Sequence, residues 1–299
     1  MASTTQARLL PTAQAGSATR QSRKRLRVLP VYLALTLAGF LVALPFIWML
    51  LTSFKTQFEA LAYPPTILPE VWHFNNYADA WRLPGPWPGG FPRYFLNTVF
   101  IAVATTAGSL FTSLLAGYTF AKMHFFGRNV VFVGLLATLM VPFEAMLVPD
   151  FVIIKSFHWY NTYQALIVPW LASVFGIFLL RQFISSLPDE LWEAAQLDGL
   201  GHAGYLYHIV TPLSLAGILT LALFNFLESW NSLLWPLIVT STDTLRPLQV
   251  GLSFFITENG TQINQLMAAA AFTIAPILVL FLVAQRQFIE GIARAGVKG

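Results

Sequence analysis

Charged residues are scarce in this chain of 299 amino acids, and their scarcity indicates the solvent in which it folds. Asp, Glu, Lys and Arg together make up 10% of the residues, whereas apolar residues make up 56%, and the mean hydropathy is +0.64. A soluble domain carries charge on about a quarter of its residues, so too little charge is present here to cover a water-facing surface. The composition therefore predicts an integral membrane protein.

Cysteine and the usual catalytic motifs are absent as well. The lack of cysteine excludes a disulfide framework and a thiolate metal site. The sequence holds no Gly-Lys pair, which excludes a phosphate-binding P-loop, and no Gly-x-Ser-x-Gly elbow. Its five histidines lack metal-ligand spacing. We expect no catalytic residue, no metal site and no cofactor in this chain, and its net charge of +4 rests on too few residues to indicate nucleic-acid binding. Any energy source must be a gradient or a partner.

Long apolar stretches are what the sequence does contain. A bilayer crossing needs about 20 mostly apolar residues, and six stretches meet or approach that length. We expect an all-α fold with about six transmembrane helices in residues 28–299, preceded by a disordered cytoplasmic tail in residues 1–27. A cleaved signal peptide is the alternative for the first stretch, which is longer than such a segment usually is. The six predicted spans are 31–52, 95–121, 130–148, 163–180, 213–239 and 266–283.

The distribution of basic residues predicts the orientation of these spans. With the N-terminus inside, twelve of the 17 Lys and Arg residues lie on the inner side of the membrane. Cytoplasmic loops carry an excess of Lys and Arg. We therefore expect both termini, and the segment between the fourth and fifth spans, to be cytoplasmic.

The segment between the fourth and fifth spans has the signals of two short helices. Ser186 and Asp189 form a possible capping pair, and Gly199 can end the first helix in a left-handed conformation. A second helix is expected from about Gly201 to Val210. We interpret the pair as coupling helices lying parallel to the membrane.

The composition of this segment favours a protein partner. Ala194 and Ala195 predict a low surface, while Glu193 and Asp198 offer charge for a directed contact. The alternative is an interfacial helix that binds only lipid, but such helices are usually rich in Lys and Arg, and residues 182–212 contain neither. We expect this segment to dock on another protein.

A second group of candidate residues lies within the predicted spans. Glu228 is flanked by Asn225 and Asn231 at spacings of three, which places the three side chains on one helix face. Such polar residues either line a translocation path or clamp helices together, and the sequence leaves both readings open. Two further path candidates are Glu144, near the end of the third span, and Trp230, whose ring could stack on a sugar or simply pack.

The docking segment resembles the Glu-Ala-Ala loop of binding-protein-dependent ABC importer permeases. The resemblance rests on Glu193-Ala194-Ala195, Asp198-Gly199, Ile209 and Pro212 at matching spacing, and it extends over about residues 28–299. The sequence departs from that pattern at Leu200 and Thr211. The chain is most similar to the smaller permease subunit of maltose-type and glycerol-phosphate-type importers. The motifs shared with this carbohydrate subgroup are Asn161-Thr162-Tyr163, Phe178-Leu179-Leu180-Arg181-Gln182-Phe183, Ser229-Trp230-Asn231, Trp235-Pro236 and Val297-Lys298-Gly299.

The resemblance implies a set of partners in the cytoplasmic membrane of a bacterium or archaeon. A dimer of cytoplasmic ATPases, which bind ATP and Mg, would hold the loop, with Glu193 as the charged contact and Gly199 setting the turn. Residues 294–299 are a second implied contact with these ATPases. A second, homologous permease would complete the pathway, and an extracytoplasmic solute-binding protein would deliver the solute to outer segments such as 241–265. The solute itself stays open.

Two other classes of function compete with an ATP-driven importer. A gradient-driven secondary transporter explains six spans and buried carboxylates, but it predicts internal repeats with paired broken helices, and no repeat is visible. It also leaves the docking segment without a purpose. A membrane enzyme lacks a catalytic constellation in this sequence.

Overall fold

The computed structural model describes residues 16–82, 90–253, 255–257 and 260–296, and it divides the chain into two units, 1–51 and 52–299. The first unit consists of most of α1 (Gly16–Ser53), which contains the predicted first span. Residues 1–15 lie outside the described residues. From Gly16 onward, the segment expected to be a disordered tail is helical.

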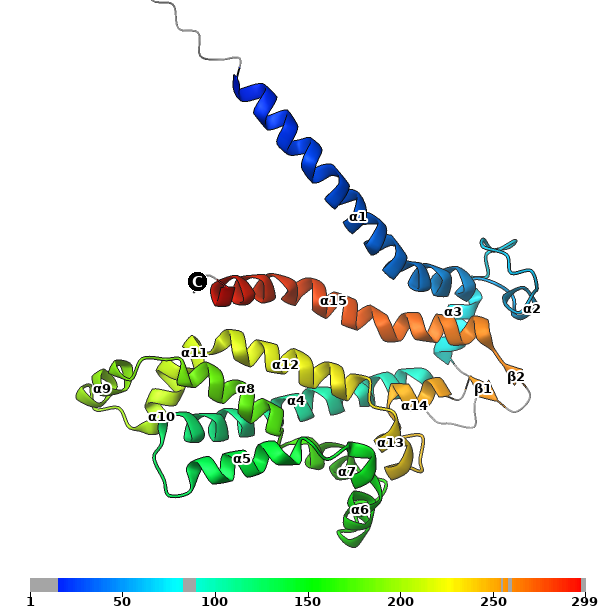
Figure 1. Ribbon diagram of the computed structural model, residues 1–299. Coiled ribbons are helices and arrows are strands. Elements are labelled where there is room, and N and C mark those ends of the chain that lie inside the picture. Colours follow the sequence, from blue (N-terminus) through cyan, green and yellow to red (C-terminus); the bar gives the residue numbers. More distant parts are fainter. Residues whose placement is uncertain (1–15, 83–89, 254, 258–259, 297–299) are drawn as a thin grey trace, which may run out of the picture. The chain divides into compact units, whose positions relative to one another are not determined.

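The second unit is almost entirely helical, which confirms the predicted fold class (Figure 1). Its one β element in the described residues is an antiparallel pair of two-residue strands. The elements are α2 (Gln57–Ala60), α3 (Asn75–Arg82), α4 (Gly90–Lys122), α5 (Arg128–Thr138), α6 (Phe143–Ser156), α7 (Tyr163–Ile167), η1 (Val168–Trp170), α8 (Val174–Ser185), α9 (Glu190–Leu197), α10 (His202–Tyr205), η2 (Leu206–Val210), α11 (Thr211–Leu213), α12 (Leu215–Trp230), α13 (Leu234–Val239), α14 (Leu248–Ser253), β1 (Ile256–Thr257), β2 (Gly260–Thr261) and α15 (Ile263–Gly296).

Four helical segments among the described residues are long and apolar enough to cross a membrane, or up to six if two bent pairs each count as one span. The four are Pro30–Ser53, Gly90–Lys122, Tyr163–Ser185 and Ile263–Leu282. They correspond to the first, second, fourth and sixth predicted stretches. The fourth is interrupted near Pro169, where η1 replaces the α-helix and Ser173 caps a new start at α8.

The third and fifth predicted stretches are not continuous helices in the structure. The third bends by 99° between α5 and α6, because Pro142 has no backbone N–H with which to continue the helix. The fifth ends at Trp230, and residues 234–239 form the separate helix α13. Upstream, α12 meets the segment His202–Leu213 at 79°.

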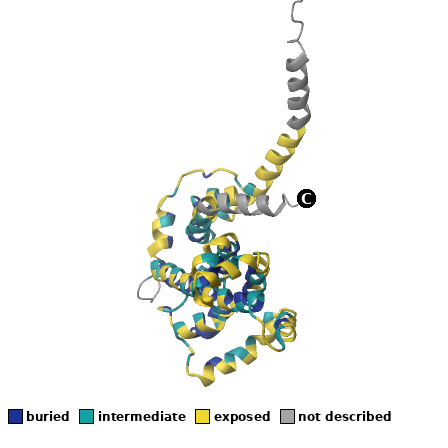
Figure 2. Ribbon diagram, turned by 90° about the vertical axis from the view of Figure 1, so that its left-hand side faces the viewer, coloured by how far each residue is buried: buried dark blue, intermediate teal, exposed yellow. Residues whose placement is uncertain are grey.

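The core of the second unit forms where α4 packs against α8 and α12, which run side by side (Figure 1). Small residues permit this close approach. A Cβ added at Gly117 of α4 would lie 3.1 Å from the Cβ of Leu180 on α8. Figure 2 shows buried residues on the inner faces of the bundle and exposed ones, many of them apolar, on the outside. That distribution suits a lipid-facing exterior.

Candidate functional site

A cavity of about 280 Å³ lies where α4, α8, α12 and α13 meet. Ile101, Thr105 and Ser109 line it from α4 at spacings of four, so they share one helix face. Aromatic rings close other sides of the cavity. The aromatic lining residues are Trp170, Phe175 and Trp235, and the remaining polar ones are Ser173, Asn225, Glu228, Ser229 and Ser232.

Asn225 combines the two roles that the sequence left open. Its Nδ2 donates a hydrogen bond of 2.9 Å to Ser109 Oγ, which joins α12 to α4 in the buried interior. Both residues also line the cavity. Thr105, one turn before Ser109, is buried and lines the same wall, and its hydroxyl has no hydrogen-bond partner among the described residues.

Glu228 is exposed on α12 and lines the cavity. Within the described part of the chain its carboxylate makes no hydrogen bond or ion pair. Asn231, the other predicted neighbour, does not line the cavity. Its Nδ2 donates to Leu227 O at 2.8 Å, and its Oδ1 accepts from Gln249 Nε2 at 3.4 Å. The structure therefore brings Asn225 and Glu228 together at the cavity and turns Asn231 to the end of α12.

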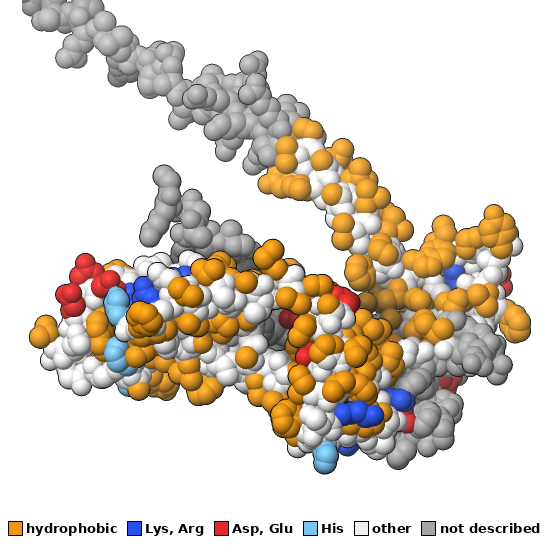
Figure 3. Space-filling model, turned by 60° about the horizontal axis from the view of Figure 1, so that its bottom comes forward, with side chains coloured by type: hydrophobic (Ala, Val, Ile, Leu, Met, Phe, Trp, Pro, Cys, Tyr) orange, Lys and Arg blue, Asp and Glu red, His pale blue; other side chains and the backbone are white. Residues whose placement is uncertain are grey.

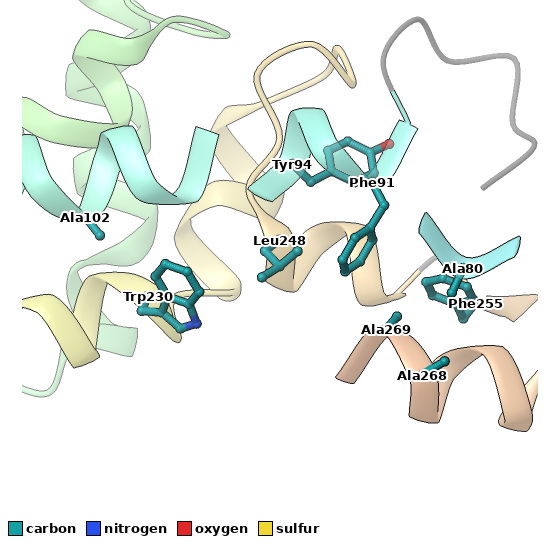
Figure 4. Close-up of a cluster of buried hydrophobic side chains, with 9 residues drawn as sticks. All are labelled: Ala80, Phe91, Tyr94, Ala102, Trp230, Leu248, Phe255, Ala268 and Ala269. Atoms are coloured by element: carbon teal, nitrogen blue, oxygen red, sulfur yellow. The ribbon is translucent and has the colours of Figure 1, made fainter. Parts of the chain in front are cut away.

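Trp230 packs into the helical core and is not among the residues that line the cavity. It is 1% exposed and lies in the buried cluster drawn in Figure 4. Its Nε1 donates to Thr273 O on α15 at 3.2 Å, and the ring of Phe226 stacks against it at 5.3 Å. This tryptophan joins α12 to α15.

Glu144 lies away from the cavity lining as well. It is exposed in the first turn of α6, where a carboxylate is favoured by the helix dipole. Trp235 is the tryptophan that lines the cavity. Its Nε1 donates to Ala165 O at 2.8 Å, and its ring meets Trp170 edge to face at 6.2 Å.

The docking segment comprises residues 186–212, and its first helix, α9, ends in a turn that glycine makes possible. Gly199 has φ +80°, which confirms its predicted left-handed conformation. Gly199 N donates to Gln196 O at 3.0 Å and Leu200 N to Ala195 O at 2.9 Å, the hydrogen bonds of a Schellman motif. The second helical segment follows as α10, η2 and α11.

The N-terminal capping pair predicted for this segment was wrong. Asp189 precedes α9 but makes no cap, and Ser186 Oγ donates to Phe183 O of the preceding helix. The Asp189 carboxylate instead accepts from Lys122 Nζ, the last residue of α4, at 2.6 Å. Lys122 Nζ also donates to Leu187 O at 2.7 Å. The hydrogen bond from Lys122, followed by its positive charge, lowers the pKa of Asp189 below its ordinary value of 3.8.

A second attachment joins the two helical segments to α4. The rings of Trp192 and His202 stack at a centroid distance of 4.4 Å and an interplanar angle of 10°. His202 Nδ1 shares a hydrogen bond of 2.7 Å with Tyr118 OH on α4. The segment is therefore fixed at two points to the helix whose middle lines the cavity.

The predicted docking residues divide into exposed and buried ones. Glu193, Ala194, Asp198 and Gly199 are exposed, and Figure 3 shows acidic side chains gathered at the end of the molecule that α9 forms. Ala195 is 1% exposed, so its interpretation as part of a low outer surface was wrong. It packs beneath the loop in a hydrophobic cluster. The buried members of that cluster are Tyr118, Leu180, Ile184, Ala195, Tyr205, Val210 and Leu221.

The two departures from the family pattern also point away from the exposed face. Leu200 is half-buried against the same cluster, and Thr211 Oγ1 donates to Leu206 O at 2.7 Å. Neither side chain contributes to the surface formed by Glu193, Ala194 and Asp198. The departures therefore affect the interior of the loop.

Several apolar membrane-length helices, a polar cavity between them and a polar loop bonded to α4 indicate a membrane transport protein. Residues 108–293, more than half of the chain, match the family model described as the binding-protein-dependent transport system inner membrane component. The chain belongs to that family. It is a multi-pass membrane protein of a transport system rather than an enzyme.

Curated relatives cover nearly the whole chain. It is 33% identical over 275 residues to the arabinooligosaccharides transport system permease protein AraQ of Bacillus subtilis, covering 89% of this chain and 96% of the relative. It is 31% identical over 264 residues to the sn-glycerol-3-phosphate transport system permease protein UgpE of Yersinia pestis bv. Antiqua, covering 87% and 94%.

A solved structure supports the fold. A chain of a bacterial ABC transporter involved in import of the acidic polysaccharide alginate matches with a TM-score of 0.77 at 20% identity. The match covers 89% of this chain and 98% of that one. A second structure of the alginate transporter, in complex with an alginate pentasaccharide-bound periplasmic protein, matches with a TM-score of 0.62 at 15% identity.

Proposed function

We propose that this chain is a permease subunit of an ATP-driven importer for a sugar or related solute. The observation that carries the proposal is the fastening of the docking segment to α4 through Lys122 and Asp189. Because α4 also lines the cavity, a force applied to the exposed residues of α9 reaches the cavity wall through one continuous helix. A secondary transporter has no need of such a connection.

The proposed motor is a dimer of cytoplasmic ATPases, which bind ATP and Mg. The docking segment then lies on the cytoplasmic side, as do both termini, in agreement with the excess of Lys and Arg expected there. Glu193 supplies the charged contact, while the turn at Gly199 fixes the direction in which α9 presents it. No cofactor is proposed for this chain itself.

A second, homologous permease is proposed to complete the pathway. Glu228 is exposed on α12, and a charged side chain at the bilayer centre costs about 2.5–3.5 kcal/mol even on lenient scales. Its carboxylate therefore faces a polar cavity or a protein partner rather than lipid. The face of α12 that carries Glu228 is the one that the second permease covers. An extracytoplasmic solute-binding protein delivers the solute from the opposite side to the motor.

Co-purification and uptake test this proposal together. The importer is expressed with its neighbouring subunits, extracted in mild detergent and analysed for an ATPase that accompanies this chain. Glu193→Lys should reduce the bound ATPase and abolish uptake, because it reverses the charge of the docking contact. Glu70→Lys is the matched control, since Glu70 is an exposed acid outside the docking segment. Absence of any ATPase, or normal uptake in Glu193→Lys, contradicts the proposal.

A further inference from the structure

The cavity has an unbalanced charge. Among the described residues that line it, Glu228 is the one ionisable side chain, and no Lys, Arg or His accompanies it. The cation of Arg246, next to the lining residue Pro247, is bound to the Asp243 carboxylate at 2.7 Å. An anion that enters the cavity therefore meets a like charge without a compensating cation among the lining residues described in this chain.

The remaining polar groups of the wall are neutral and suit hydroxyl groups. Ser109 and Asn225 are joined by their mutual hydrogen bond, whereas the Thr105 hydroxyl has no partner among the described residues although the residue is only 5% exposed. A buried hydroxyl without a partner is costly unless a ligand or water satisfies it. Thr105 therefore carries an unpaired hydroxyl beside the cavity, and its oxygen is buried in this structure.

The aromatic side chains of the wall suit the apolar faces of a sugar ring. Trp170 and Trp235 meet edge to face, and Trp235 is held in place by its hydrogen bond to Ala165 O. Phe175 adds a third ring at the cavity. Apolar walls with a few placed polar groups are the usual composition of a small-ligand site.

We propose that this cavity accepts uncharged sugar units and disfavours anionic ones such as sugar phosphates and uronates. The proposal rests on the importer function proposed above and adds its charge selectivity. Its volume of about 280 Å³ lies just below the range of about 300–1,000 Å³ of small-ligand sites, so it holds part of an oligosaccharide at a time. The relatives and the solved structure named above belong to transport systems for arabino-oligosaccharides, sn-glycerol 3-phosphate and an acidic polysaccharide, so both neutral and anionic solutes occur among them.

Equilibrium binding to the assembled importer in lipid nanodiscs, without its solute-binding protein, tests this selectivity. The probes are the methyl glycosides of glucose, galactose and mannose and the methyl glycosides of the corresponding uronic acids, which differ only in replacing CH₂OH by a carboxylate. Intrinsic tryptophan fluorescence reports occupancy, because Trp170 and Trp235 line the cavity. If part of the fluorescence response is lost in Trp170→Phe, that part of the response arises from Trp170.

The wild-type importer should bind at least one neutral glycoside about tenfold more tightly than its uronate. Glu228→Gln should remove most of that difference by strengthening uronate binding, while the neutral glycoside stays within about twofold, because it carries no net charge. Glu144→Gln is the matched control and should change neither affinity, since Glu144 is an exposed acid that does not line the cavity.

Three results overturn the proposal: uronates that bind the wild type as tightly as neutral glycosides, a Glu228→Gln variant that keeps the full difference, or no fluorescence response to any glycoside. These results are distinguishable from failure of the importer function itself. If an ATPase co-purifies and uptake depends on Glu193 while the glycosides and uronates bind alike, only the charge selectivity is wrong.

Discussion

The ammonium group of Lys122, at the last residue of α4, lies 2.6 Å from the carboxylate of Asp189, just before α9. The same ammonium group donates to Leu187 O, so one side chain holds two points of the docking segment. Lys122 has 9% of its side chain exposed, whereas Asp189 has 83% exposed. The pair connects a buried helix end to a loop on the surface of the chain.

Lys122→Met should uncouple ATP hydrolysis from transport. The variant loses both contacts of the Lys122 ammonium group and keeps only the attachment through Tyr118 and His202, so movement of α9 is transmitted to α4 less tightly. We expect solute uptake per ATP hydrolysed to fall about fivefold or more. The measurement is uptake and ATPase activity on the same reconstituted preparation. Lys122→Arg keeps the charge and should retain most of the coupling, and equal uptake ratios in all three proteins would argue against a coupling role for Lys122.

The ion pair between Lys122 and Asp189 should help to order α9 at neutral and mildly acidic pH. Because the pKa of Asp189 is lowered in the folded protein, its contribution to stability is fully present above its ordinary value of 3.8 and is lost as the pH falls through the lower folded value. Hydrogen-exchange protection of residues 190–197 should therefore be constant from about pH 8 to pH 5. Asp189→Asn should show lower protection throughout that range. A steep loss of protection in the wild type between these pH values is the contrary result.

Gly199→Ala should loosen the docking segment because it forces a side chain into a left-handed conformation. The strain amounts to about 1–2 kcal/mol, although no atom crowds the position. We expect less ATPase to co-purify and faster exchange of the amides of α9. Gly201→Ala is the matched control, since Gly201 has φ −84° and open space around it. Equal behaviour of the two variants contradicts the role given to the turn.

Two substitutions on α12 distinguish a residue that lines the translocation path from one that holds helices together. Glu228→Leu should impair uptake without preventing assembly, because its carboxylate is exposed at the cavity and bonds to no described residue. Asn225→Leu should lower the melting temperature, since it leaves Ser109 unpaired at a cost of about 1–3 kcal/mol. Thermal unfolding and uptake, measured on both variants, make the distinction. Loss of assembly in Glu228→Leu instead assigns the clamping role to that residue.

The sequence predicted membrane helices well where composition alone decides them. Lipid requires long apolar helices, so the first, second, fourth and sixth spans agree with the structure. The third and fifth differ because hydropathy does not register a helix break within an apolar run. Pro142 ends one helix, and the break after Trp230 depends on local hydrogen bonds such as that from Asn231 to Leu227 O.

The sequence predicted which residue types are candidates for the path, but not where their side chains point. Asn225 and Glu228 are three positions apart and both line the cavity, as their spacing on one helix face predicted. Trp230 instead points into the core, where it stacks on Phe226 and donates to the α15 backbone. The sequence analysis did not identify Thr105 and Ser109 as lining residues of the cavity. Both carry hydroxyl groups and lie four positions apart, so their shared helix face was a usable signal. Lys122 and Asp189 lie 67 positions apart, so only the packing of α4 beside the loop could reveal their pairing.

Cross-linking from the docking segment is the most direct test of the account. The chain contains no cysteine, so a single introduced thiol reacts alone within it. In the assembled importer, Ala194→Cys should be joined to the ATPase subunit by a short thiol-to-amine cross-linker, because Ala194 is exposed beside Glu193. Ala62→Cys, which is exposed outside the docking segment, should give no such product. A cross-link from Ala194→Cys that is absent from Ala62→Cys is the predicted result, and equal or absent cross-linking at both positions contradicts the account.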